Sequence, residues 1–95
     1  MQQILLNNSL ILTLEPQDKK VRMIVSATEG ELACRKESIG QLKKFLATTE
    51  GTIFKGRLQL SKHGDVIEVI VKNRSIAVVA TSVFEQALEN LLSGK

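Results

Sequence analysis

Two stretches of the sequence follow one order of features, and this order constrains the fold more than any other property of the chain. Residues 67–82, IEVIVKNRSIAVVATS, contain an alternating apolar segment, a short polar turn, a second apolar segment and a helix-start signal. Residues 21–38, VRMIVSATEGELACRKES, follow the same order. Because alternation with a period of two is typical of half-buried β-strands, each stretch predicts a hairpin that leads into a helix.

One further alternating segment precedes each predicted hairpin, so each half has three predicted strands. They cover residues 9–14, 21–27 and 31–35 in the first half, and residues 52–61, 66–72 and 76–80 in the second. Gly64 in the turn KHGD suits the positive φ of a tight hairpin. The residues predicted to face inward are Leu10, Leu12, Leu14, Val21, Met23, Val25, Ala27, Leu32, Cys34, Phe54, Leu58, Leu60, Ile67, Val69, Val71, Ile76, Val78 and Ala80.

A helix is predicted after the third strand of each half. Ser38 with Gln41, and Ser82 with Glu85, have the spacing of a capping box at a helix N-terminus. Gly94 is a suitable stop for the second helix. The apolar stripes that follow the caps are Ile39, Leu42, Phe45 and Leu46 in the first helix, and Phe84, Ala87, Leu88, Leu91 and Leu92 in the second.

The predicted fold class is α+β, with two βββα units that form an antiparallel sheet and two helices packed on one face of it. The units are interpreted as a pseudo-repeat of roughly 45 residues. Three strands and one helix bury too little core to fold alone, so residues 1–50 and 51–95 are expected to be similar halves of a single domain. Two such units can also arise without duplication. Ile4, Leu5 and Leu6 are expected either to lengthen the first strand or to cover an edge.

The composition is that of a globular chain whose core is built from aliphatic residues. Of its 95 residues, 43% are hydrophobic and only 3% are aromatic. Cys34 is the one cysteine, so an intramolecular disulfide is excluded. The segment MQQILLNNSLILTL lacks the basic start of a signal peptide, and no apolar run reaches the roughly 20 residues that span a bilayer. We therefore expect a cytoplasmic protein without membrane association.

The predicted outward face of the sheet is basic. Its five cations exceed its one carboxylate, Glu68, although the whole chain has a formal charge of only +3. Such a face could follow a phosphate backbone, with Arg22, Arg35, Lys55, Arg57 and Lys72 as contacts and Arg74 at the adjoining turn. The other interpretation is an ordinary solvated face. This face has no aromatic side chain for base stacking, so binding would depend on charge and would have low sequence specificity.

The same outward face carries β-branched apolar residues, Ile11, Ile24, Ile70 and Val79. Residues of this kind suggest that a second copy or a protein partner covers part of the face. Isolated exposed apolar residues are also normal on protein surfaces, so this alternative stays open.

The order of three strands and one helix, twice over in residues 9–93, resembles the duplicated units of the PUR-repeat and Whirly-type single-strand-binding families. Those units usually carry one extra strand per repeat. The resemblance rests on the order of elements, without a shared motif. It implies nucleic-acid binding by analogy, and no site residue is transferred from it.

Residues with catalytic or metal-binding chemistry are sparse. Cys34 is predicted to be a buried core thiol, and its only possible base, His63, lies in a turn of the other half. His63 with Asp65 supplies too few ligands for a stable metal site. Phosphate-binding glycine motifs are absent from the sequence. We therefore expect no catalytic residue, no metal and no cofactor.

The functional expectation is a small non-catalytic binding protein. The leading interpretation is charge-driven binding of single- or double-stranded nucleic acid through the basic sheet face. The alternative is a protein-interaction or homodimeric assembly module that uses the same face.

Overall fold

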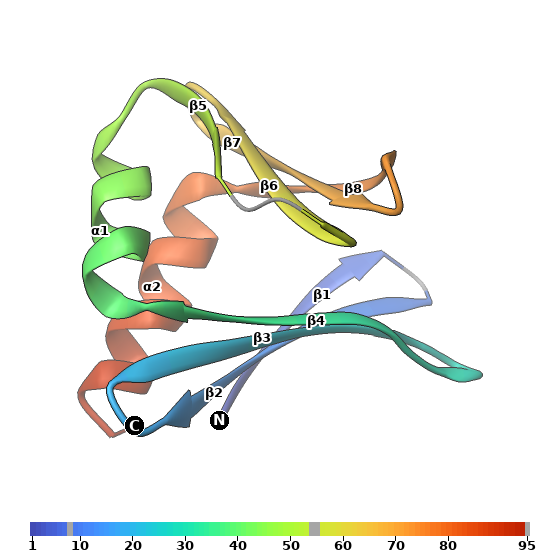
Figure 1. Ribbon diagram of the computed structural model, residues 1–95, viewed down its shortest axis with the longest axis horizontal. Helices are drawn as coiled ribbons and strands as arrows, with labels where there is room; N and C mark the ends of the chain where they lie inside the picture. The colour runs from blue at the N-terminus through green and yellow to red at the C-terminus, as the bar shows by residue number, and fades with distance from the viewer. Residues whose placement is uncertain (8, 54–55, 95) are drawn as a thin grey trace.

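The structure is a computed structural model that describes residues 1–7, 9–53 and 56–94, and the side chain of Ile53 is not part of the description. Two antiparallel four-stranded sheets and two helices make an α+β fold (Figure 1). The N-terminal sheet consists of β1 (Gln2–Asn7), β2 (Leu10–Gln17), β3 (Lys20–Ala27) and β4 (Gly30–Ser38), and α1 (Ile39–Ala47) follows it. The C-terminal sheet consists of β5 (Glu50–Ile53), β6 (Leu58–His63), β7 (Val66–Val71) and β8 (Arg74–Ala80), followed by α2 (Thr81–Leu92).

Each half has one strand more than the sequence predicted, and the strands form two sheets instead of one. β1 covers the segment around Ile4 that was expected to lengthen the next strand or cover an edge. β5 begins at Glu50, before the single strand that was predicted for residues 52–61, and β6 is a separate strand. Neither segment shows clear alternation, because Ile4, Leu5 and Leu6 are consecutive and Gly51 has no side chain to contribute to a pattern.

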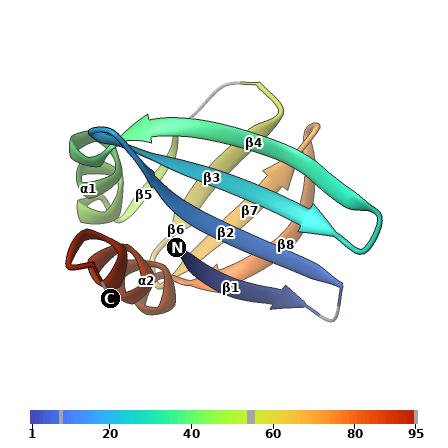
Figure 2. The same ribbon diagram turned by 90° about the horizontal axis from the view of Figure 1, so that it is seen from below.

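The apolar faces of both sheets and the inner faces of both helices contribute to one continuous core. Figure 1 shows the helices side by side at one end of the molecule, and Figure 2 shows that the strands of one sheet cross those of the other. α2 packs against β1 and β2, so the last helix of the chain lies on the first sheet. The side chains that are almost fully excluded from solvent are Phe45, Phe84, Leu12, Leu14, Met23, Leu42, Leu58, Leu60, Ile67, Val21, Val25 and Val69.

A β-bulge in the N-terminal sheet reverses part of the predicted facing of β4. Val25 lies opposite Ala33, but the next residue of β3, Ser26, lies opposite Glu31, so Leu32 is an extra residue in β4. One extra residue moves every following side chain to the other face of the sheet. Ala33 is therefore buried in the core, whereas Cys34 is exposed. The prediction of an inward Cys34 and an outward Ala33 was wrong for this reason.

The C-terminal sheet has a bulge at the corresponding step of β8. Val69 lies opposite Ala77, while Ile70 lies opposite Ser75, so Ile76 is the extra residue. Val79 is consequently buried at 6% exposure, and Val78 is exposed at 54%. The sequence prediction had these two residues the other way round, and the bulge is again the physical cause.

The two helices begin differently. Ser38 is the N-cap of α1, and its hydroxyl accepts a hydrogen bond of 3.2 Å from the Gln41 amide, as the sequence predicted. α2 begins earlier than predicted, with Ala80 as an N-cap that offers no side-chain hydrogen bond. The predicted cap at Ser82 was therefore wrong. Gly94 follows the end of α2 with a φ of 78°, which confirms its role as a stop.

Candidate nucleic-acid interface

Three of the six predicted contact residues gather at one tip of the C-terminal sheet. Lys72 and Asn73, with φ of 53° and 64°, form the two-residue turn between β7 and β8, and Arg74 opens β8. The Lys72 amide donates a hydrogen bond of 2.8 Å to the carbonyl of Arg57. This bond holds the start of β6 beside the turn, and we name Arg57, Lys72 and Arg74 the basic tip.

The basic tip lies at the end of β7 and β8 that points away from both helices (Figure 1). All three of its side chains belong to exposed residues. Within residues 1–7, 9–53 and 56–94, none of the three forms an ion pair with a carboxylate. Their positive charge is therefore available to an anionic ligand from solution.

Arg35 comes from the other sheet and does not lie on an outward face. It lies opposite Met23, so it shares the core-facing side of the N-terminal sheet, and the predicted facing was wrong because of the bulge at Leu32. Its Nε lies 3.4 Å from the Glu37 carboxylate. A Cβ atom placed on Gly56 would lie 3.7 Å from Nη1 of Arg35, so the guanidinium group lies close to the bend that leads into the basic tip.

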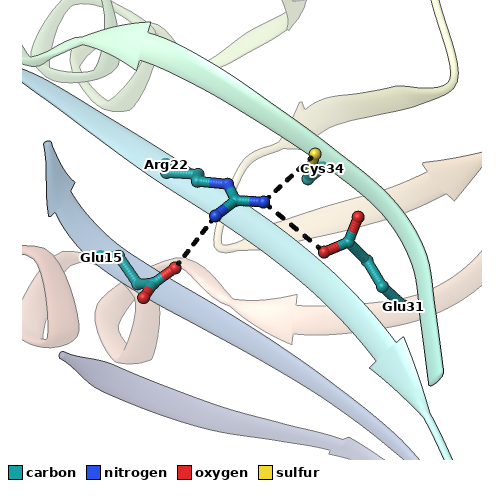
Figure 3. A network of polar contacts seen from close by, with 4 residues as sticks. All are labelled: Glu15, Arg22, Glu31 and Cys34. Carbon is teal, nitrogen blue, oxygen red and sulfur yellow. Dashed lines mark hydrogen bonds and ion pairs between the residues drawn. The ribbon is translucent and has the colours of Figure 1, made fainter.

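Arg22 lies on the outward face of the N-terminal sheet, as predicted, but carboxylates surround it (Figure 3). Its guanidinium nitrogens lie 3.7 Å from Glu15 and 3.7 Å from Glu31. A longer contact of 4.0 Å joins Nη2 to the Cys34 sulfur, and this contact is the largest cause that raises the pKa of Arg22. Two nearby negative charges make Arg22 a poor contact for a phosphate group.

Lys55, the sixth predicted contact, lies outside the described residues. The others are divided among the basic tip, the bend beside Gly56 and the outward face of the N-terminal sheet. Because each sheet turns its apolar face toward the shared core, the outward faces point away from each other. A single continuous basic sheet face therefore does not exist in the described part of the chain.

A second basic cluster was missed by the sequence analysis. Lys19, Lys20 and Lys36 line a hollow of about 400 Å³ at the β2–β3 turn, together with Gln17 and Asp18. The signal was present in the pair Lys19–Lys20, but the proximity of Lys36 depends on the register of β3 with β4, where Lys36 lies opposite Arg22.

Lys62 has a structural role that its sequence position in the predicted turn did not suggest. It belongs to β6, lies opposite Ile67 and is buried at 6% exposure. Its Nζ donates a hydrogen bond to the carbonyl of Thr48, the C-cap residue of α1. A cation at the negative end of a helix dipole is favourable, so Lys62 stabilises α1 and does not contribute to the surface charge.

The four predicted apolar interface residues do not form one surface. Ile11 and Ile24 lie on the outward face of the N-terminal sheet, whereas Ile70 lies on the outward face of the C-terminal sheet. Val79 is part of the core, so the prediction that it faces outward was wrong. Leu5, which lies opposite Ile11 and is 70% exposed, was not included in the prediction.

The polar groups around His63 are not arranged to activate the Ser61 hydroxyl as a nucleophile. His63 Nε2 lies 3.1 Å from the Ser61 hydroxyl and 3.8 Å from the Glu68 carboxylate. In a catalytic triad the acid holds the ring nitrogen that the nucleophile does not use, whereas here both groups approach the same nitrogen. The Ser61 hydroxyl also shares a hydrogen bond of 2.9 Å with Thr52.

Other chemistry is equally sparse in the described residues. Cys34 and His63 lie on the outward faces of different sheets, so they form no thiol–imidazole pair. Among residues 1–7, 9–53 and 56–94, no three His, Cys, Asp or Glu residues are grouped to hold a metal ion. No helix within these ranges is long and apolar enough to cross a bilayer. No family model, curated protein or solved structure matches the chain.

Proposed function

We propose that the protein is a small non-catalytic nucleic-acid-binding protein whose main contact is the basic tip. The observation that carries the proposal is the hydrogen bond from Lys72 to Arg57, because it gathers three exposed cations from two separate segments. Lys43 on α1, by contrast, lines a hollow together with two carboxylates of α2, Glu85 and Glu89.

The mechanism is charge neutralisation with release of condensed counterions. Phe45 and Phe84 are buried at 2% and 0% exposure, so neither can stack on a base. Within the described residues no aromatic side chain is available for base stacking, so we expect binding to depend on charge and to have low sequence specificity. Three phosphate contacts correspond to a slope of about −2.7 in a plot of log K against log salt concentration for duplex DNA, and about −2.1 for single strands.

Fluorescence anisotropy with single- and double-stranded oligonucleotides of several sequences tests the proposal. With three contacts on a duplex, affinity falls about 40-fold between about 50 and 200 mM salt. The triple variant Arg57→Ala, Lys72→Ala, Arg74→Ala is expected to lose most of this salt dependence. The matched control is Lys19→Ala, Lys20→Ala, Lys36→Ala, which removes the same charge at the β2–β3 turn. No binding by the wild type at low salt, or equal losses in both variants, would contradict the proposal.

We further propose that residues 1–50 and 51–95 are a structural repeat. Both halves have the order ββββα, and the register shifts occur at Val25/Ser26 and at Val69/Ile70, which are 44 positions apart. The bulged residues Leu32 and Ile76 show the same separation. Nuclear magnetic resonance tests this proposal, because it detects cross-strand proton contacts between the paired residues next to each bulge. A missing bulge in either half would argue against the repeat.

A further inference from the structure

The four edge strands of the two sheets differ in how well they are protected against pairing with another strand. An edge strand offers unpaired backbone N–H and C=O groups, and proteins usually protect it with charged residues, proline, bulges or very short length. β1 and β4 are the edges of the N-terminal sheet, and β5 and β8 are those of the C-terminal sheet.

Three of these edges carry a recognised form of protection. β4 has a bulge at Leu32 and contains the charged residues Glu31, Arg35, Lys36 and Glu37. β5 has four residues and begins with Glu50 and Gly51. β8 begins with Arg74 and has a bulge at Ile76. Each of these features disfavours the addition of a further strand.

β1 lacks the charged residues that the other three edge strands carry. Its sequence, QQILLN, contains no charged residue, proline or glycine, and its register irregularity, between Leu5 and Asn7, leaves residues 2–5 in unbroken register with β2. It forms the lower margin of the molecule in Figure 2. Leu5 projects from it with 70% exposure. Such an uncharged, apolar edge is well suited to accept another strand.

A hollow of about 450 Å³ lies between this edge and α2. Residues 2–5 of β1 form one wall, and α2 forms the other with residues that include Val83, Gln86 and Asn90. Val83 is exposed at 47%, and the described lining contains no charged side chain. An occupant that carries charge would find no counter-charge there, so the hollow suits an uncharged extended segment.

We propose that β1 pairs antiparallel with β1 of a second copy about a two-fold axis. β1 is itself an uncharged extended segment, so the same surface supplies both the site and its occupant, as an isologous dimer interface requires. The pairing joins the two N-terminal sheets into one eight-stranded sheet. It adds backbone hydrogen bonds along both edges and covers the exposed Leu5 of each copy.

Charge complementation tests this inference on the full-length chain without nucleic acid. Gln3 and Leu5 are exposed and lie on one face of β1, opposite Thr13 and Ile11. The variant Gln3→Lys, Leu5→Lys and the variant Gln3→Glu, Leu5→Glu each place like charges across the dimer axis. Light scattering after gel filtration is expected to show a dimer for the wild type, monomers for each variant and dimers for their equimolar mixture.

The matched control is Ser75→Lys, Val78→Lys, which makes the same type of change at two exposed residues of the β8 edge. We expect it to remain dimeric, and circular dichroism shows whether each variant is folded. A wild type that is monomeric at about 1 mM would overturn the inference, because no dimer of useful strength then exists. A dimer that persists in both β1 variants would place the interface elsewhere and would also overturn it.

Discussion

Arginines on the two sheets are used in different ways. Arg22 on the N-terminal sheet lies between Glu15 and Glu31, which come from the strands on either side of it. Arg57 and Arg74 at the basic tip have no carboxylate partner within the described residues. The difference shows that an outward-facing cation is available to a ligand only where the neighbouring strands place no carboxylate beside it.

The two sheets also share a feature that makes them comparable. Each has a bulge in its fourth strand, and in each the residue that follows the bulge faces the core. Ala33 and Ala77 occupy these positions, opposite Val25 and Val69. The inner faces of the two sheets are thus alike. The sheets differ in the charges on their outward faces and in how the helix that follows each of them begins.

The largest expected effect tests the bulge of β8. Val79→Lys places an ammonium group in the core, and an uncompensated buried charge costs about 3–5 kcal/mol. Val78→Lys changes the adjacent residue, which is 54% exposed, and we expect a change within about 0.5 kcal/mol. Urea denaturation of both variants gives the two free energies of unfolding. A larger loss for Val78→Lys than for Val79→Lys would contradict the bulge.

This pair of residues also shows what the sequence can and cannot predict. The pattern in β2, β3, β6 and β7 correctly predicted which apolar side chains enter the core, because each of these strands has a polar residue between two apolar ones, which indicates the facing. In β8 the segment IAVVA is apolar throughout, so either facing is consistent with its sequence. The bulge at Ile76 depends on pairing with β7, and hydrophobic pattern contains no information on that pairing.

The candidate site was predictable in part for a similar reason. The sequence identified the residues of the basic tip, but their proximity results from the backbone bond between Lys72 and Arg57. The neutralisation of Arg22 depends on which residues lie on either side of it, Glu15 in one strand and the segment around Glu31 in another. Contacts between strands of this kind are set by register, so the predicted continuous basic face did not form.

A smaller effect distinguishes the helices that follow the two sheets. Ser38→Ala removes the side-chain N-cap of α1 and is expected to lower the free energy of unfolding by about 1 kcal/mol. Ala80→Ser introduces a hydroxyl at the uncapped start of α2, whose extended φ and ψ of −63° and 136° suit an N-cap, and is expected to stabilise by up to about 1 kcal/mol. Thermal denaturation checks both signs. A destabilising Ala80→Ser variant would show that α2 begins elsewhere.

The smallest effect concerns single cations and returns to the two arginines. Arg74→Ala removes one unpaired charge from the basic tip, and the proposed phosphate contact predicts that the salt-dependence slope for duplex DNA falls by about 0.9. Arg22→Ala also removes one positive charge, but it leaves Glu15 and Glu31 without their partner, so we expect the slope to stay unchanged. Anisotropy titrations at several salt concentrations measure both slopes. Equal decreases for the two variants would show that net charge, and not the location of the unpaired cations, determines binding.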